Sequence, residues 1–271
     1  MTLQVANRQD VFALDAELYL PKQWTDDPRR MRSAKIPEHV GYQPKWELAL
    51  DMLERAAAQG FDGLALADAE FGSVTKFRES VSEHGLQYAV GIDNTIAIID
   101  ATLDLGAPPP RKKQRGRPPS RPQKVSAGLE TESVKQWALR QARDFRRVTW
   151  RVGTKGKMQQ RFAAWRVRPA YKTRAGRTPL SPVWLLAEWP ADKDAPTKYF
   201  FLSLDERASL QRLVTTAKSR WPVEQSYREL KQELGFDDFE GRSYRGWQHP
   251  VTLVFLAYAF LVAERRKKRG A

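Results

Sequence analysis

The segment between residues 44 and 92 alternates between helical and strand-like patterns, and it constrains the fold more than any other part of the chain. Apolar residues recur at helical spacing from 44 to 59, and a glycine follows them. Residues 63–68, GLALAD, form a short apolar run typical of a buried central strand. A second helical pattern covers 73–84, and strand-like QYAVGI follows at 87–92. This alternation predicts an α/β fold around a central sheet.

The remaining segments suggest three parts. The chain opens with two strand-like runs, and residues 22–42 are expected to form a charged loop. Residues 108–124 contain seven basic residues, six prolines and no acid, which predicts an extended basic loop. After a short helix near 132–145, the runs RVTWRV, RFAAWRV, VWLLAEW and KYFFLSL predict a small antiparallel β subdomain. We therefore expect an N-terminal core part at 1–93, an insertion at 94–206, and a C-terminal helical part at 207–271 that ends in a basic tail.

The charge balance predicts an anionic partner. The chain has 46 Lys and Arg against 32 Asp and Glu, a formal net charge of +14. Nucleic acid is the simplest partner for this excess, although an unspecialised basic protein would show it too. The absence of cysteine excludes disulfides, thiolate zinc sites and cysteine nucleophiles. No signal peptide is evident, and the apolar run near 251–262 is interrupted and short for a membrane span, so we expect the cytoplasm.

The stretch 220–247 predicts a helix that carries chemistry. Pro222 suits a first helical turn, and Gly235 suits a left-handed stop. Helical spacing places Glu224, Arg228 and Lys231 on one face, beside an apolar stripe formed by Val223, Tyr227, Leu230 and Leu234. A carboxylate between fixed cations can hold a divalent metal near a phosphate. A salt-bridged surface helix has the same pattern, so both interpretations stay open.

Asp68 is the second candidate acid, because it ends a predicted central strand, and active sites form at the carboxyl ends of such strands. Together with Glu224 it would offer oxygen ligands to Mg²⁺ or Mn²⁺. It could equally cap the next helix or form a turn, and Glu70 competes for the same role.

The histidines and the basic loop are two further groups of polar residues. The three histidines, His39, His84 and His249, have no metal-ligand spacing. Arg115 and Arg117 lie in the basic loop, where an extended Arg-Gly-Arg-Pro could enter an A·T-rich minor groove of DNA or serve as solvated linker.

With these residues in view, the chain resembles the DDE transposases of bacterial insertion sequences. Their helix signature is Tyr-x2-Arg-x3-Glu-x6-Lys; Arg220, Glu224 and Lys231 are in register with it, whereas Ala217 replaces the tyrosine. Residues 67–92 resemble the segment of the second aspartate, 239–261 the stretch after the glutamate, and 18–24 the strand and loop before the first core helix.

The resemblance implies a ribonuclease-H-like core with a β-rich insertion, and DNA transposition by metal-dependent phosphoryl transfer. It makes Asp68 and Glu224 ligands of Mg²⁺ or Mn²⁺, with Arg220 and Lys231 as phosphate-positioning catalytic residues. Arg242, Arg245 and Trp247 would contact double-stranded DNA at the element ends.

One departure bears on activity. The family's first catalytic aspartate has no match, because neither Asp10 nor Asp15 occupies its position. We therefore expect an N-terminally truncated and catalytically impaired chain that binds metal weakly. There are two alternatives. The chain could be a non-catalytic DNA-binding module, or it could be a structural or regulatory partner that associates with other copies of itself or with a full-length transposase. If the site forms, the carboxylates of Asp68 and Glu224 should lie about 5–8 Å apart.

Overall fold

The computed structural model describes residues 1–7, 10–103, 131–153, 156–170 and 181–270. The chain divides into two compact units. The first unit comprises Met1–Gly63 and Ser219–Ala271, and the second unit comprises Leu64–Lys218. These boundaries differ from the expected ones near 93 and 206, because the division follows packing between residues far apart in sequence.

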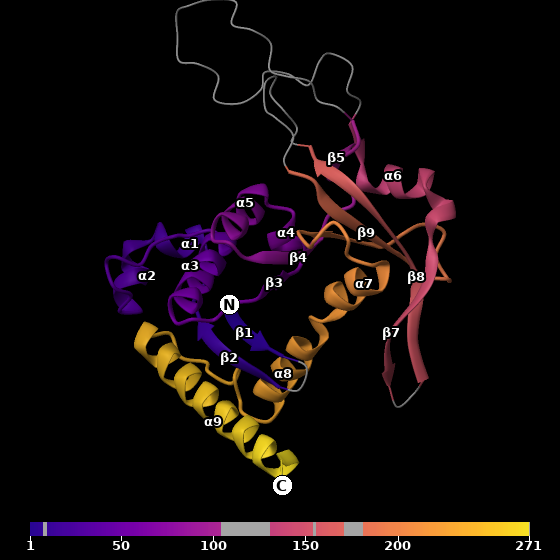
Figure 1. Cartoon of the computed structure of the whole chain (residues 1–271). Helices are drawn as coiled ribbons and strands as arrows, with labels where there is room; N and C mark the ends of the chain where they lie inside the picture. The colour runs from indigo at the N-terminus through magenta and orange to yellow at the C-terminus, as the bar shows by residue number, and fades with distance from the viewer. Residues whose placement is uncertain (8–9, 104–130, 154–155, 171–180, 271) are drawn as a thin grey trace, which may run out of the picture. The chain divides into compact units, whose positions relative to one another are not determined.

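A mixed eight-stranded sheet forms the second unit (Figure 1). Its strands are β3 (Leu64–Ala67), β4 (Gln87–Ile92), β5 (Ala97–Asp100), β6 (Glu132–Ser133), β7 (Arg146–Gly153), β8 (Gly156–Pro169), β9 (Val183–Trp189) and β10 (Lys198–Leu202). The strand order is β3-β4-β10-β9-β8-β5-β6, and β7 pairs with β8. Strands β3 and β4 are parallel, whereas the other pairings are antiparallel.

The strands expected in a separate β subdomain belong to this same sheet. Strand β10 pairs with β9 on one side and with β4 on the other, where Phe200 lies opposite Gly91. The expectation of a buried central strand at 63–68 was wrong for this sheet: β3 stands first in the strand order and is half-buried. Of the two parallel strands, β4 is the buried strand, because it lies between β3 and β10.

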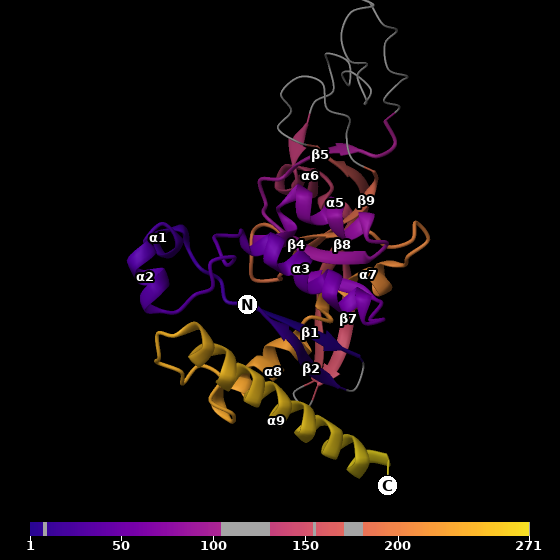
Figure 2. The ribbon, with the colours of Figure 1, turned by 90° about the vertical axis from the view of Figure 1, so that its left-hand side faces the viewer.

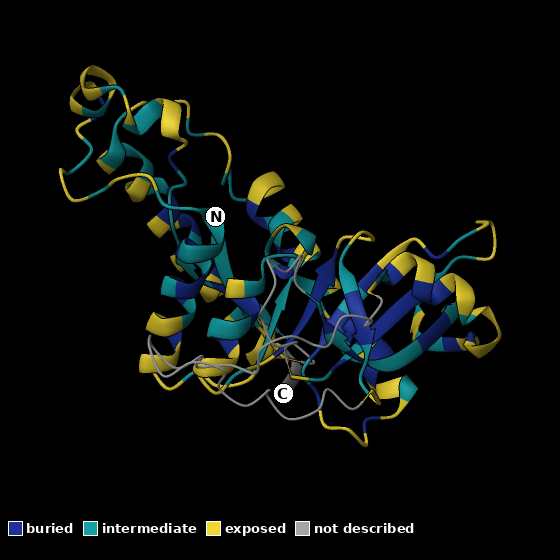
Figure 3. Ribbon diagram, turned by 90° about the horizontal axis from the view of Figure 1, so that it is seen from above, coloured by how far each residue is buried: buried dark blue, intermediate teal, exposed yellow. Residues whose placement is uncertain are grey.

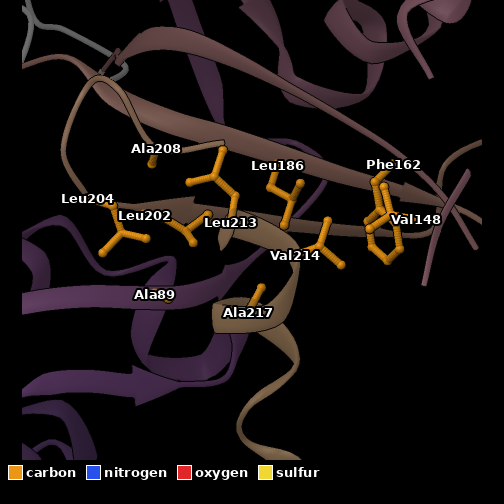
Figure 4. Packing of buried hydrophobic residues seen from close by; sticks show 10 residues of the cluster. All are labelled: Ala89, Val148, Phe162, Leu186, Leu202, Leu204, Ala208, Leu213, Val214 and Ala217. Atoms are coloured by element: carbon orange, nitrogen blue, oxygen red, sulfur yellow. The ribbon is translucent and has the colours of Figure 1, made fainter. Parts of the chain in front are cut away.

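Helices cover both faces of the sheet, and its central strands are mainly dark blue in Figure 3. They are α4 (Ala69–Gly72), α5 (Thr75–Glu83), α6 (Val134–Arg140), a 3₁₀ turn (Ala142–Asp144) and α7 (Leu210–Lys218). Helix α7 inserts Leu213 and Val214 among Phe162, Leu186 and Leu202, all of them fully buried (Figure 4). Neighbouring strand residues point to opposite faces, so Phe201 lies on the other face, where the guanidinium of Arg78 from α5 covers its ring at 5.2 Å.

The first unit is built on a hairpin of β1 (Thr2–Ala6) and β2 (Val11–Ala16). Its helices are α1 (Lys22–Thr25), α2 (Pro28–Ser33), α3 (Lys45–Ala58), α8 (Trp221–Gln232) and α9 (Tyr244–Gly270). Helices α8 and α9 lie along the hairpin (Figures 1 and 2). Ala13, Leu230, Val254 and Tyr258 form the buried centre of this packing.

Two expectations in the first unit need correction. Residues 22–42 are not wholly loop: Asp27 caps α2 by accepting hydrogen bonds from the backbone of Arg29 and Arg30, and Pro28 occupies the first helical position. Helix α9 begins at Tyr244 and continues through the basic residues that were expected to form a tail.

By length and composition α9 could cross a membrane, and it is the one such helix in the described part of the chain. This is weak evidence for a span. One face of α9 packs into the core through Val251, Val254 and Tyr258, whereas Leu253, Leu256 and Phe260 are exposed.

Candidate metal site and nucleic-acid interface

Asp68 stands at the junction between β3 and α4. Its side chain accepts a hydrogen bond from the backbone N–H of Glu70 at 3.0 Å, so it caps α4, a short helix before the predicted helix at 73–84, which it does not cap. The carboxylate is exposed. A cap occupies Oδ1 with a backbone donor, and a carboxylate has acceptor capacity on both oxygens, so capping and metal binding are compatible.

Two glycines let this junction lie close against β4. A Cβ atom on Gly72 would come within 2.0 Å of the Gly91 carbonyl oxygen, and one on Gly91 within 3.0 Å of the Ala69 nitrogen. No side chain fits at Gly72, and one at Gly91 would press on the backbone of Ala69, so the two glycines allow Asp68 to lie close to β4.

Asp93 is a further carboxylate at this edge, and the sequence reasoning missed it. It directly follows β4, and because β3 and β4 are parallel, their carboxyl ends lie at the same edge of the sheet. Asp93 is exposed, and its backbone N–H donates to Ser73 Oγ at 2.9 Å. The rule that singled out Asp68, an acid directly after an apolar strand, would have found it.

The second candidate acid, Glu224, lies in the first turn of α8 in the first unit. The predicted start and stop of this helix are confirmed: Pro222 lies in its first turn, and Gly235 has a φ of +65° just beyond its end. Glu224, Arg228 and Lys231 are exposed, whereas Leu230 is fully buried, so the predicted polar and apolar faces are confirmed as well.

Side-chain hydrogen bonds tie the buried side of α8 to β1. Ser226 donates to the Gln4 side chain, and the hydroxyls of Thr2 and Tyr227 are bonded to each other. The exposed face that carries Glu224 is therefore held by the hairpin.

The cations beside Glu224 form exposed ion pairs. Arg220 lies 2.9 Å from Glu224 Oε1, and the two side chains are 40% and 58% exposed. Lys231 lies 3.3 Å from Asp237 Oδ2, and both side chains are about half exposed. Exposed pairs of this kind contribute roughly 0–1 kcal/mol, so a phosphate or a metal ion can replace either partner at small cost.

The other predicted contacts are distributed over two segments. Arg242 and Arg245 are exposed at and just before the start of α9, and Trp247 is half-buried in its first turn. Arg115 and Arg117 lie outside the described residues.

No cluster of three or more His, Asp or Glu side chains that could hold a metal occurs in the described ranges. His84 directly follows α5, near the end of the helix predicted at 73–84, and Gly85 has a φ of +74°. The candidate ligands are therefore Asp68 in the second unit and Glu224 in the first, and their convergence stays a prediction.

Comparison with known families decides what this arrangement belongs to. A family model described as DDE superfamily endonuclease matches residues 1–157, which is more than half of the chain. The chain belongs to the DDE endonuclease superfamily. The predicted transposase-type domain and its ribonuclease-H-like α/β fold are thereby confirmed, and the mixed sheet flanked by helices agrees with them. No curated protein matches the chain.

Membership of the DDE endonucleases gives the coarse chemistry. These enzymes act on DNA and typically use divalent metal ions. The matched range contains Asp68 and ends before Glu224. Carboxylate oxygens suit Mg²⁺ and Mn²⁺, so both acids have the right donor chemistry for the metals of the superfamily.

Proposed function

We propose that this DDE endonuclease derives from a transposase of a bacterial insertion sequence, and that Asp68 and Glu224 bind Mg²⁺ or Mn²⁺ for phosphoryl transfer on DNA in the cytoplasm. The observation that carries the proposal is the family match, which covers an exposed aspartate directly after the carboxyl end of β3. Active sites of open α/β sheets form at such strand ends.

Each proposed residue has a separate task. A divalent ion held by Asp68 and Glu224 would lower the pKa of a bound water and neutralise charge on the phosphate. The attacking oxygen, from water or a 3′-hydroxyl, forms a bond to phosphorus while the bond to the leaving oxygen breaks. Arg220 and Lys231 would hold the non-bridging phosphate oxygens after releasing Glu224 and Asp237. Arg242, Arg245, Trp247, Arg115 and Arg117 are proposed DNA contacts.

We expect this 271-residue chain by itself to cleave DNA poorly. The resemblance calls for a third acid, and the best-placed early candidate, Asp15, is paired with Arg55 at 2.8 Å in the first unit. Two carboxylates hold a hydrated Mg²⁺ weakly, because the ion requires octahedral oxygen ligation and retains its waters readily.

Manganese binding tests the ligands independently of activity. We expect Asp68→Asn and Glu224→Gln each to weaken Mn²⁺ binding, measured by the electron paramagnetic resonance signal of the free ion. Glu70→Gln and Asp93→Asn are matched controls at the same sheet edge. If the controls weaken binding and the two proposed ligands do not, the assignment is wrong.

Convergence can be tested by cross-linking, because the chain contains no cysteine. Asp68→Cys combined with Glu224→Cys should react within one molecule with a short thiol-bridging reagent. No bridging in the folded protein would exclude a shared site.

The lack of a match for the family's first aspartate favours one second candidate: a DNA-binding or regulatory partner of a full-length transposase, without cleavage of its own. Cleavage of element-end DNA with Mg²⁺ or Mn²⁺, abolished by Glu224→Gln, would exclude this candidate and the expected impairment.

A further inference from the structure

Strands β7 and β8 form a two-stranded ribbon that extends beyond the rest of the sheet (Figure 1). Strand β9 pairs with β8 from Arg161 to Val167, whereas residues 157–160 of β8 lie past the end of β9 and pair with β7. We call residues 147–153 and 156–161 the β7–β8 ribbon. At about 3.4 Å per residue, the part beyond β9 is on the order of 15 Å long.

The ribbon lies in the longest stretch of the sequence without an acidic residue. Between Asp144 and Glu188 the chain has 11 Lys and Arg and no acid. Arg147, Arg151 and Lys157 are exposed on the ribbon. These cations stand on both strands, so the ribbon presents positive charge along both of its edges.

The strand register places two of the cations against each other. Arg147 lies directly opposite Arg161. The guanidinium of Arg161 lies 4.8 Å from the centre of the Trp189 ring on β9, so Arg147 is the exposed cation of this pair. Charges on an edge strand can also serve to prevent edge-to-edge aggregation. Positive and negative side chains both prevent such aggregation, so this role does not explain why the segment between Asp144 and Glu188 contains no acidic residue.

The base of the ribbon is firmly anchored. Trp150 packs edge-on against Phe162 with ring centroids 5.6 Å apart, and Lys218 Nζ lies 4.9 Å from the centre of the Trp150 ring. Gln211 of α7 donates a hydrogen bond to the carbonyl of Thr149 at 2.9 Å. An isolated two-stranded hairpin is marginally stable, so this anchoring holds the ribbon in a defined direction.

The dimensions fit one groove of duplex DNA. Paired strands lie about 4.8 Å apart, and with side chains a ribbon fills a width of roughly 10 Å. The B-form major groove is about 12 Å wide and admits a two-stranded ribbon. The major groove of A-form RNA is too narrow for side chains to read.

We propose that the β7–β8 ribbon is a DNA-binding arm, which lies in the major groove and contacts phosphates on both sides through Arg147, Arg151 and Lys157. This inference rests on the proposed function in that DNA is the partner. It adds a contact surface that is separate from the residues proposed above.

Salt-dependent binding tests the arm. The triple variant Arg147→Gln, Arg151→Gln, Lys157→Gln is titrated with a fluorescent 20-base-pair duplex in EDTA at several KCl concentrations. Each phosphate contact contributes about 0.9 to the slope of log K against log salt, so we expect the slope to be less steep by about 2.7. Lys157→Gln alone should change it by about 0.9.

A matched control keeps the test specific. Lys193→Gln, Lys198→Gln, Arg207→Gln removes the same charge from exposed positions of the second unit outside the ribbon. We expect this triple to leave the slope nearly unchanged. Equal changes of slope in the two triple variants would mean that DNA is attracted by the overall positive charge, and they would refute the proposal that the ribbon is a DNA-binding arm.

An RNA duplex of the same sequence tests the groove. We expect the wild-type chain to prefer DNA and the ribbon triple to lose that preference; equal binding of both duplexes by the wild type would overturn major-groove docking. EDTA removes the metal site from the measurement. DNA binding without a ribbon effect therefore contradicts this inference alone, whereas no DNA binding contradicts the proposed function too.

Discussion

The buried ion pair between Lys218 and Glu188 should be the costliest single contact to break in the second unit. Lys218 Nζ lies 2.5 Å from Glu188 Oε2, and their side chains are only 16% and 7% exposed. The same ammonium lies 4.9 and 5.5 Å from the ring centres of Trp150 and Phe162. Removing the lysine leaves a buried carboxylate without its cation, in a place that water scarcely reaches.

We expect Lys218→Met to lower the free energy of unfolding by about 3 kcal/mol. Removal of one partner of a buried pair costs roughly 3–5 kcal/mol, and the partial exposure of Lys218 places it at the lower end. With an m value of about 2 kcal/mol/M, the urea midpoint should fall by about 1.5 M. Tryptophan fluorescence is the signal of choice, since Trp150 contacts the substituted side chain.

The double variant Lys218→Met, Glu188→Leu separates the pair from simple packing. Apolar replacement of a whole buried pair is often neutral or stabilising, so the double variant should recover most of the loss. Lys193→Met is the control, because its exposed pair with Asp192 is worth at most about 1 kcal/mol. A loss below about 1 kcal/mol for Lys218→Met would refute this reasoning, since the pair would then behave as a surface contact.

Two further predictions concern packing and pH. Gly72→Ala should destabilise the second unit by at least about 1–3 kcal/mol in urea unfolding, because its Cβ would meet the backbone of Gly91; Gly153→Ala, whose Cβ meets nothing closer than 3.9 Å, should cost less than half as much. Burial, with the nearby Glu229 carboxylate, raises the pKa of Tyr258 to about 12. Folding thus favours the neutral phenol, so the contribution of Tyr258 to folding stability is complete below pH 10 and is lost as pH rises toward 12. Tyr258→Phe should therefore flatten the fall of melting temperature between about pH 9.5 and 11.5. Equal losses of stability for Gly72→Ala and Gly153→Ala would contradict the packing prediction. A pH profile that Tyr258→Phe leaves unchanged would contradict the pH prediction.

Local signals in the sequence were sufficient for most elements. The stop at Gly60 and the periodic apolar residues predicted α3, and Pro222 with Gly235 predicted both ends of α8. These signals act within a few residues, because a helix forms its hydrogen bonds within four positions and a cap within three. The same locality made α2 detectable in principle, since Asp27 and Pro28 form a helix-start pattern.

The candidate acids were also found from sequence, by position rather than by contact. Asp68 follows an apolar strand, and Glu224 falls on the exposed face of a periodic helix. The competing roles were not resolved: Asp68 does cap α4, and Glu224 does form a surface ion pair with Arg220. Both interpretations describe the same side chain, because an exposed carboxylate can serve a local role and still accept a ligand.

The sequence by itself determined the α/β class, the positions of most strands and helices, and the basic character of the chain. Only the tertiary structure decided that the strands after residue 146 join β4 in one sheet, that Arg147 faces Arg161, and that Lys218 is buried against Glu188. The physical reason is range: periodicity and capping are set by near neighbours, whereas strand register and buried charge pairs join residues 14 to 113 positions apart and arise only when the whole core packs.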